Sequence, residues 1–278
     1  MDLVIDTNCL QDSLLEDFLL QKPTNRALIT DYAKREIQQT VSIDRVRDSL
    51  AILSRFPEQI VFLKGTASAM RNRGRISGLQ RRLIDQRETN FFPQFCKMIY
   101  GESPQAKAFQ SSFLKHSAEA KEFMNSLIKN MDGTIELYQG LELEWPKEAI
   151  SLLRKTGYAD SKESIEWLFR FMSDLTSQVV SKAPGGISWP AKHEWPFMFS
   201  YRSCLFYALH FQEWLIKGSP DEIAAKNLRN DVVDINFATF ATFFDGLMTR
   251  DRKCEARYFE GRVLLDKALI PALSKNKN

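Results

Sequence analysis

The chain has 278 residues, of which 44% are hydrophobic and 12% aromatic, enough for a substantial core in one or two domains. Its net charge of only +3 does not by itself indicate a nucleic-acid partner. The four cysteines are scattered and form no CxxC pair, which argues against a disulfide framework or a zinc site: Cys9, Cys96, Cys204 and Cys254.

The expected compartment follows from the hydrophobic pattern. The first apolar run begins at residue 3 with an acid on each side, which is unlike a secretory signal peptide. No run approaches the roughly 20 apolar residues of a membrane span. We therefore expect a soluble, cytoplasmic protein that makes no membrane contact.

The first predicted element is a short strand at residues 3–5, which a carboxylate follows at once. The three residues are apolar and suit a strand buried on both faces. Asp6, Thr7 and Asn8 come next, and apolar residues between positions 10 and 19 then fall on one helical face. In a parallel sheet this places Asp6 at the carboxyl edge, where open sheets bind ligands. The alternative is that Asp6 or Asn8 only caps the helix.

The alternation of strands and helices continues to residue 64. Residues 27–29 form a second strand candidate, and Thr30 is a plausible N-cap of the helix that carries Glu36. Ser42 begins another helix, and residues 60–63 are a third strand candidate. This order predicts an α/β fold with a parallel sheet sandwiched by helices.

Residues 64–88 form a basic segment. Seven basic residues face two acidic ones, a local charge of +5 in a chain whose total is +3. Arginine on a flexible segment suits phosphate binding, because its guanidinium group can contact two phosphate oxygens at once. The alternative is a solvated basic helix face. The residues predicted to bind nucleic acid are Arg71, Arg73, Arg75, Arg81 and Arg82.

The next hundred residues are predicted to be mainly helical. Candidate helices run over about 91–100, 104–131, 146–156 and 161–182, and another runs from about 195 to 217. The last of these is rich in aromatic residues, which could stack on a nucleic-acid base. So many together are more simply explained by a helix buried in the core.

Carboxylates return near the C-terminus. Asp231 and Asp234 are three apart in the helical stretch 227–244 and therefore share one face. Residues 246–249 are a fourth strand candidate, which ends in Thr249-Arg250-Asp251. A second carboxylate therefore follows the end of a strand, and a final helix is expected over 252–267.

If the strands are parallel neighbours, the acids of these segments meet at one edge of the sheet. Several unpaired carboxylates in one cleft repel one another unless hard cations lie between them. Mg²⁺ or Mn²⁺ fits such oxygen ligands, and one or two such ions can activate a water for phosphodiester hydrolysis. The predicted metal ligands are Asp6, Glu36, Asp231, Asp234 and Asp251.

This order of motifs resembles that of the PIN-domain nucleases. The matching parts are Asp-Thr-Asn at 6–8, Glu36 on an early helix, Arg-Asn-Asp at 229–231 and Thr-Arg-Asp at 249–251. The resemblance covers residues 1–64 and about 200–265. It implies that Asp6, Glu36, Asp231 and Asp251 are catalytic, with Thr7, Asn8, Asn230 and Thr249 in support.

The resemblance also defines the expected organisation. Residues 1–64 and 200–278 would form a PIN-like nuclease core, and residues 65–199 a large, mainly helical insertion. A compact PIN domain joins its halves by a short helical link. The insertion could serve as a substrate lid, a platform for a protein partner or a regulatory lobe, and oligomerisation stays open.

The function implied by the resemblance is that of a metal-dependent endoribonuclease, since RNA is the usual substrate of PIN-like enzymes. A structure-selective DNA nuclease would use the same chemistry. A third interpretation is a catalytically inactive PIN-like module that binds nucleic acid or protein. Other catalytic motifs are missing: the sequence has no Walker loop, no GxSxG elbow and no GxGxxG after Ile5.

Overall fold

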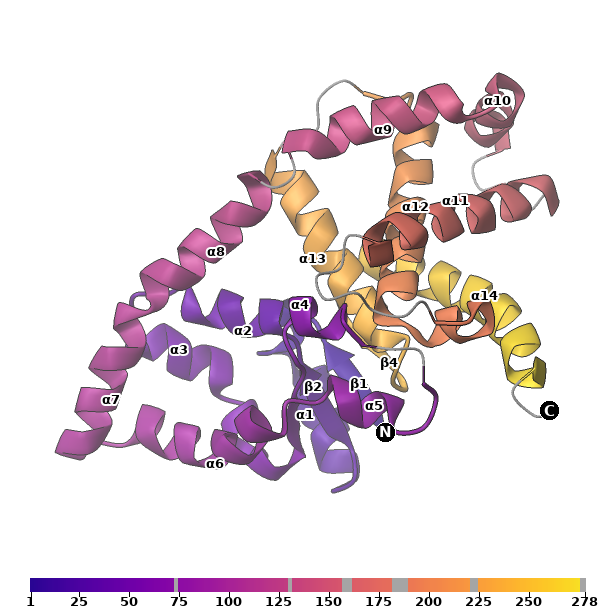
Figure 1. The fold of residues 1–278 in the computed structure, drawn as a ribbon. Helices are drawn as coiled ribbons and strands as arrows, with labels where there is room; N and C mark the ends of the chain where they lie inside the picture. Colours follow the sequence, from indigo (N-terminus) through magenta and orange to yellow (C-terminus); the bar gives the residue numbers. More distant parts are fainter. Residues whose placement is uncertain (73–74, 130–131, 157–161, 182–189, 221–224, 276–278) are drawn as a thin grey trace.

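A parallel four-stranded sheet forms the centre of the N-terminal part of the chain (Figure 1). The computed structural model describes residues 1–72, 75–129, 132–156, 162–181, 190–220 and 225–275. The strands are β1 (Asp2–Ile5), β2 (Arg26–Ile29), β3 (Ile60–Phe62) and β4 (Gly246–Met248), in the order β3-β2-β1-β4. The predicted α/β class with a parallel sheet is confirmed, and each predicted strand lies within one residue of its observed position.

The strand order marks one position on the sheet. The chain steps from β1 to β2 to β3 in one direction and then returns to place β4 on the other side of β1. In open α/β sheets, ligands bind outside the carboxyl ends of the strands at such a reversal. Here the reversal lies between β1 and β4, so we call the end of the sheet where both strands finish the carboxyl edge.

Three helices and three short 3₁₀ turns complete the N-terminal part. Helix α1 (Ser13–Gln21) begins at Asp12, whose carboxylate accepts a hydrogen bond from the backbone N–H of Leu14 at 2.9 Å. Helix α2 (Asp31–Gln38) begins at Thr30, as predicted. The remaining elements are η1 (Thr7–Cys9), α3 (Ile43–Leu50), η2 (Leu53–Arg55) and η3 (Pro57–Gln59).

The basic segment (residues 64–88) begins just after β3 and folds back so that Ile84 lies beside the end of β3. It contains α4 (Thr66–Ala69) and α5 (Leu79–Leu83). Leu63 pairs with Ile84 in an antiparallel bridge, and the side-chain amide of Gln80 donates to the backbone carbonyl of Phe243 at 2.8 Å. The segment is therefore fixed to the sheet at one point and to the turn between α13 and β4 at another.

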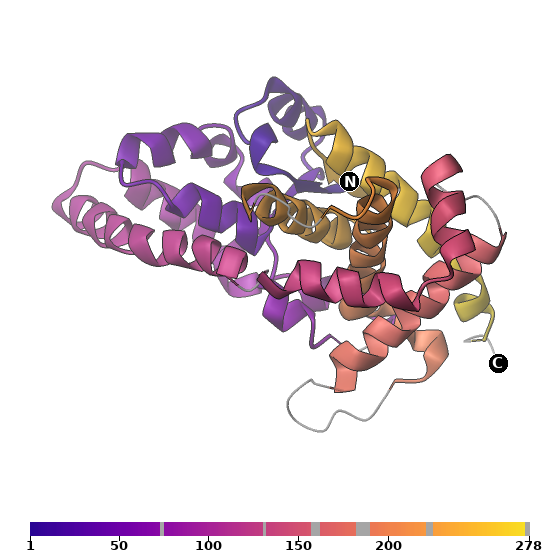
Figure 2. The same ribbon diagram turned by 90° about the horizontal axis from the view of Figure 1, so that it is seen from above.

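The helical insertion runs along the outside of the molecule and then over it (Figures 1 and 2). Its helices are α6 (Gln86–Tyr100), α7 (Pro104–Lys115), α8 (Ser117–Lys129), α9 (Asp132–Glu144), α10 (Lys147–Thr156) and α11 (Lys162–Ser181). The single helix predicted over 104–131 is wrong. The first helix ends at His116, where the ψ angle is 0°, and a second helix begins at Ser117.

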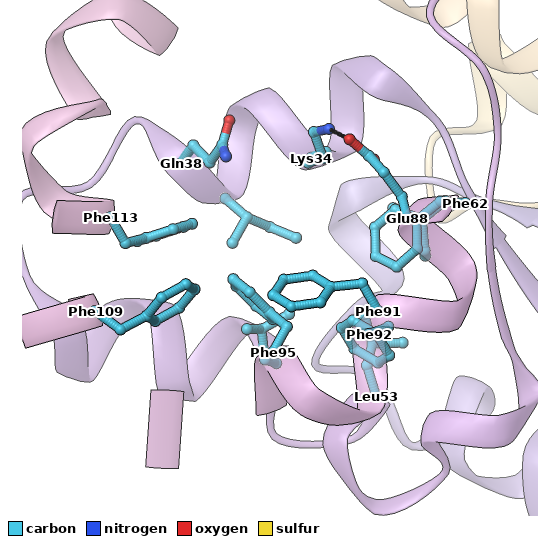
Figure 3. A pocket seen from close by; sticks show the side chains of 13 residues that line it. Lys34, Gln38, Leu53, Phe62, Glu88, Phe91, Phe92, Phe95, Phe109 and Phe113 are labelled. Carbon is cyan, nitrogen blue, oxygen red and sulfur yellow. Dashed lines mark hydrogen bonds and ion pairs between the residues drawn. The ribbon is translucent and has the colours of Figure 1, made fainter. Parts of the chain in front are cut away.

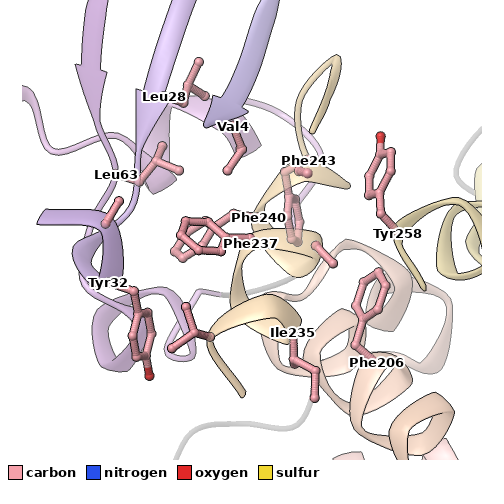
Figure 4. Packing of buried hydrophobic residues seen from close by; sticks show 14 of the residues in the cluster. Val4, Leu28, Tyr32, Leu63, Phe206, Ile235, Phe237, Phe240, Phe243 and Tyr258 are labelled. Carbon is pink, nitrogen blue, oxygen red and sulfur yellow. The ribbon is translucent and has the colours of Figure 1, made fainter. Parts of the chain in front are cut away.

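The C-terminal helices pack together and against the sheet. They are α12 (Phe199–Ile216), which follows η4 (Lys192–Phe197), then α13 (Ala225–Ala241) and α14 (Arg252–Lys275). Helix α12 is buried along almost its whole length, which confirms its prediction as a core helix. Helix α13 turns Phe237 and Phe240 toward the sheet residues Val4 and Leu28 (Figure 4).

One hydrophobic cluster extends through both predicted parts of the chain. Met124 and Met172 of the insertion belong to the same cluster as Val4 and Phe237. Helices α12 and α14 lie so close together that a Cβ atom at Gly261 would be only 2.4 Å from the ring of Phe206. The division at residues 65 and 199 stays a prediction, although the insertion shares its core with the rest.

Within the described ranges, we find no helix that combines the length and the apolar character needed to cross a membrane.

An apolar pocket of about 230 Å³ lies between α2, α3, α6 and α7 (Figure 3). Several phenylalanines line it, and an ion pair between Lys34 and Glu88 lies at one end. It contains none of the predicted site residues. The phenylalanine rings at the wall of this pocket are Phe62, Phe91, Phe92, Phe95, Phe109 and Phe113.

Candidate active site

Asp6 lies at the carboxyl edge, immediately after β1, as the sequence predicts. Its backbone N–H donates to the carbonyl of Met248 at 3.0 Å, which joins β1 to the end of β4. Its side chain is buried, with 5% exposure, and Oδ2 accepts hydrogen bonds from Asn8 Nδ2 at 2.7 Å and Thr249 Oγ1 at 2.6 Å. Oδ1 accepts from the Thr7 hydroxyl at 3.3 Å. These donors hold the Asp6 carboxylate in one orientation.

Asn8 and Thr249 link the loops that follow β1 and β4. Asn8 Oδ1 accepts from the backbone N–H of Arg250 at 3.1 Å, and Thr249 Oγ1 accepts from the backbone N–H of Asp251 at 3.0 Å. Asp6 also accepts from the backbone N–H of Asn8 at 3.5 Å and so caps η1. The capping alternative therefore describes part of what Asp6 does, but it does not account for the contact with Thr249.

Glu36 lies on α2, close enough to Asp6 for the charge of Asp6 to affect its pKa. Burial raises the pKa of Glu36, a hydrogen bond with Thr7 lowers it, and the charge of Asp6 raises it again. The cation of Arg229 on α13 opposes this rise. Glu36 therefore shares an acidic environment with Asp6.

Asp234 is the α13 carboxylate that faces the acids of the sheet. Burial, together with the charges of Asp251, Asp6 and Asp231, raises the pKa of Asp234 to about 7, and the cation of Arg257 opposes this rise. Within the described part of the chain, no side-chain or backbone donor contacts the Asp234 carboxylate. Its charge is therefore compensated less than that of any neighbouring acid.

Asp251 begins α14. Its Oδ1 accepts from the backbone N–H groups of Lys253 at 2.7 Å and Cys254 at 3.0 Å. It is exposed, and its charge is the first acidic influence on Asp234. Asp6, Glu36, Asp234 and Asp251 thus form one electrostatically coupled group, which we call the acid cluster.

Asp231 lies one turn before Asp234 and is bound by cations. Its Oδ1 accepts from Lys253 Nζ at 2.5 Å and Arg257 Nη2 at 3.4 Å, and its Oδ2 faces His210 Nε2 at 3.2 Å. Burial alone would raise the pKa of Asp231, but His210 and Lys253 hold it well below its usual range. Both carboxylate oxygens therefore already have partners.

A buried polar network surrounds Asp231 and joins four helices. Because a carboxylate only accepts hydrogen bonds, His210 Nε2 donates to Asp231, and Nδ1 forms a hydrogen bond with the Tyr138 hydroxyl at 2.8 Å. Arg257 Nη2 also donates to Glu213 Oε2 at 2.6 Å. The network fixes α9, α12, α13 and α14 around the turn that precedes Asp234.

Several of these residues are not recognisable as site residues in the sequence. His210 and Glu213 are three residues apart on α12, and Lys253 and Arg257 are four apart on α14. Neither spacing predicts a contact with an acid on α13. Asp31, at the end of β2, accepts from the Thr66 backbone N–H at 2.8 Å and from its hydroxyl at 3.1 Å. Its place after a predicted strand was the signal that could have found it.

A mixed polar pocket of about 400 Å³ opens beside the acid cluster between α12 and α13, and we call it the α12–α13 pocket. Its walls combine acids, lysines and amides with one tryptophan and one proline. The lining residues are His210, Glu213, Trp214, Lys217, Pro220, Asn227, Asn230, Asp231, Asp234, Asp251 and Lys253. Asn230, predicted in support of the site, is therefore at its wall, and it is exposed.

The basic segment is only partly available for binding. Arg71, Arg75 and Arg81 are exposed, whereas Arg82 donates to Asn72 Oδ1 at 2.8 Å and to the backbone carbonyls of Ser77 and Arg75. Arg82 thus holds the loop together, and Arg73 lies outside the described residues.

The donor chemistry of the acid cluster suits a hard cation, because all four side chains are carboxylates and no cationic side chain among the described residues contacts the Asp234 carboxylate. In the described residues, no group of three or more acidic, histidine or cysteine side chains is arranged so that it could hold a metal ion. Mg²⁺ does not require one, since it is commonly bound by one or two carboxylates and keeps several waters. The acid cluster is therefore compatible with Mg²⁺ or Mn²⁺.

The fold and the site define a class: a parallel α/β protein with a buried aspartate where β1 ends and an exposed one where β4 ends. Comparisons with protein families, with curated proteins and with solved structures find no match.

Proposed function

We propose that the protein is a metal-dependent nuclease that hydrolyses phosphodiester bonds at the carboxyl edge of the sheet. The observation that carries this proposal is the meeting of carboxylates from β1, α2, α13 and α14 at the strand reversal. Structural ion pairs do not account for it, because Asp234 has no cationic contact to its carboxylate in the described residues.

Each acid has a proposed part. Asp6 and Asp234 would hold Mg²⁺ or Mn²⁺, which would keep several waters, and Glu36 and Asp251 would orient waters. When bound, such a cation lowers the pKa of a water and polarises the phosphoryl oxygens. In the reaction, the water oxygen bonds to phosphorus, the bond from phosphorus to one sugar oxygen breaks, and a phosphate monoester and a free hydroxyl result. Asn8 and Thr249 hold Asp6 in place through their hydrogen bonds.

Asp231 has a different role in this proposal from the one its sequence motif implies. Its oxygens are occupied by Lys253, Arg257 and His210. We therefore assign Asp234 as the principal ligand of α13, and Asp231 as the residue that positions it. The sequence interpretation ranked the two the other way round.

The substrate class rests on the resemblance to PIN-domain nucleases, which favours RNA over DNA. The exposed Arg71, Arg75 and Arg81 would contact the nucleic-acid backbone. A structure-selective DNA nuclease would use the same acids. An inactive binding module would have no use for an acid such as Asp234, whose carboxylate has no cationic contact among the described residues. We also propose that the helical insertion binds a protein partner and that the protein is cytoplasmic.

The test is cleavage of labelled RNA and DNA by the purified protein with Mg²⁺, with Mn²⁺ or with a chelator. Asp6→Asn keeps the shape of the side chain and removes its charge, so it should abolish cation-dependent cleavage in a folded protein. Asp44→Asn is the matched control, because Asp44 is an exposed acid on α3. Full activity of Asp6→Asn would rule out the proposed site.

A further inference from the structure

The α12–α13 pocket has two chemically different ends. Asp234 and Asp251, which belong to the acid cluster, define what we call the inner end of the pocket, and Lys217 at the end of α12 and Asn227 in the first turn of α13 define its outer end. Asn227 and Asp234 are two helical turns apart on α13, about 10 Å along the helix axis. The pocket therefore leads away from the acid cluster toward a region of hydrogen-bond donors.

The lysines of the pocket retain unused donors. Lys217 Nζ donates to Glu213 Oε1 at 2.7 Å, and its side chain is 58% exposed. Lys253 Nζ contacts Asp231 and Glu213, and its side chain is 42% exposed. An ammonium group has three N–H donors, so among the described residues two donors of Lys217 and one of Lys253 have no partner. Glu213 holds both lysines at the pocket wall without using all their donors.

The other walls suit the remaining parts of a nucleotide. Asn227 and Asn230 carry amides that both donate and accept hydrogen bonds, as recognition of a base edge or a sugar hydroxyl requires. Pro220 adds apolar surface, and Trp214, which is almost fully buried, lies behind it in the wall. A volume of about 400 Å³ lies within the range of pockets that enclose small organic ligands.

We propose that the α12–α13 pocket binds one unpaired nucleotide next to the phosphodiester bond that is cleaved, with Lys217 contacting its phosphate. This inference rests on the proposed nuclease function and narrows its substrate to single strands. A base inside a duplex is stacked and paired, so it cannot enter such a pocket without first being unpaired. The acids at the inner end would repel a second phosphate unless a cation lay between them.

The experiment measures binding without turnover. A short fluorescent single-stranded RNA is titrated with the full-length protein in a chelator, at several salt concentrations. Lys217→Gln should weaken binding by about three- to tenfold and lower the salt slope by about one. Lys107→Gln is the matched control, since Lys107 is 64% exposed and pairs with Glu102 on another surface. It should bind as the unchanged protein does.

A second arm tests the single-strand requirement. The same sequence annealed into a blunt duplex should bind more weakly, and Lys217→Gln should then have no effect. Equal effects of Lys217→Gln and Lys107→Gln, or the same loss with duplex and single strand, would overturn the pocket assignment. Cleavage that depends on Asp6 but not on Lys217 would support the nuclease function and contradict nucleotide binding in the α12–α13 pocket. Binding that depends on Lys217 without any cleavage would support nucleotide binding there and contradict the nuclease function.

Discussion

The Thr249 hydroxyl donates a 2.6 Å hydrogen bond to the Asp6 carboxylate, although the two residues are 243 positions apart in the chain. The bond crosses from the end of β4 to the end of β1, where the strand order reverses. The same hydroxyl also accepts a hydrogen bond from the backbone N–H of Asp251. The Thr249 side chain therefore fixes the positions of Asp6 and Asp251 relative to each other.

Replacing Thr249 tests this relationship. Thr249→Val keeps the size and branching of the side chain and removes both hydrogen bonds. Loss of such a contact behind a metal ligand typically costs 10- to 100-fold in metal affinity or activity. We expect that loss with little change in the melting temperature, measured by Mn²⁺ titration and thermal unfolding. Thr249→Ser should retain most of the affinity, and an equally impaired Thr249→Ser would contradict the hydrogen-bond explanation.

The two aspartates of α13 should differ in the kind of defect they cause. Asp234→Asn removes the least compensated acid and should abolish cleavage while leaving the protein folded. Asp231→Asn leaves Arg257 buried with one fewer partner, so it should lower the free energy of unfolding by about 2–4 kcal/mol. Urea unfolding and Mg²⁺-dependent cleavage of both variants separate these effects. A stable, inactive Asp231→Asn together with a fully active Asp234→Asn would reverse the assignment.

The buried network also predicts an acid-dependent loss of stability. Burial alone would raise the pKa of Glu213, but Lys217 and Arg257 lower it to about 2 in the folded protein, against 4.5 as the ordinary value. The lowered pKa contributes stability above about pH 4.5, which is lost as the pH falls toward 2. Allowing for solvent screening, we expect about 1–2 kcal/mol from this residue. Urea unfolding between pH 6 and pH 3, at roughly unit steps, should show a smaller pH slope for Glu213→Gln.

The exposed arginines of the basic segment should act through charge alone. Reversing Arg75 and Arg81 to Glu should weaken RNA binding for all sequences and reduce the salt slope by about one per phosphate contact. Arg45→Glu on α3 is the control, because Arg45 is equally exposed outside the segment. An unchanged salt slope would assign the segment to another surface role.

Gly261 and Gly140 offer a matched pair for the packing of α12 on α14. Alanine at Gly261 would press its Cβ into Phe206, so it should destabilise the protein by about 1–3 kcal/mol. Alanine at Gly140 meets nothing within 4 Å and should stabilise α9 by up to about 1 kcal/mol, as helix propensity alone dictates. Thermal unfolding of both variants checks the opposite signs.

The sequence predicted the sheet well because its signals are local. Each strand is a short apolar run next to a helix start, and Asp6 and Asp251 follow two of those runs directly. The partners of Asp231 could not be predicted in this way. Tyr138, His210 and Arg257 come from three other helices, and their contact depends on how those helices pack.

The break at His116 escaped prediction for a related reason. The apolar stripe continues through it, from Phe113 to Phe123, so periodicity alone favours one helix. The structure separates α7 from α8 there, and α8 then packs near α2, where Phe123 contacts Tyr32 with ring centroids 6.1 Å apart. A tertiary contact outweighs the local pattern.

The position of β1 between β2 and β4 also governs how the protein can be made. During synthesis β2 emerges soon after β1, but the edge of β1 that receives β4 stays unpaired until residues 246–248 are available. An unpaired strand edge invites association with other chains, and so distant a pairing slows folding. Completion of the sheet and assembly of the acid cluster are therefore a single late event. In a nascent chain, Asp6 therefore gains its hydrogen bond from Thr249 only after residue 249 has been synthesised.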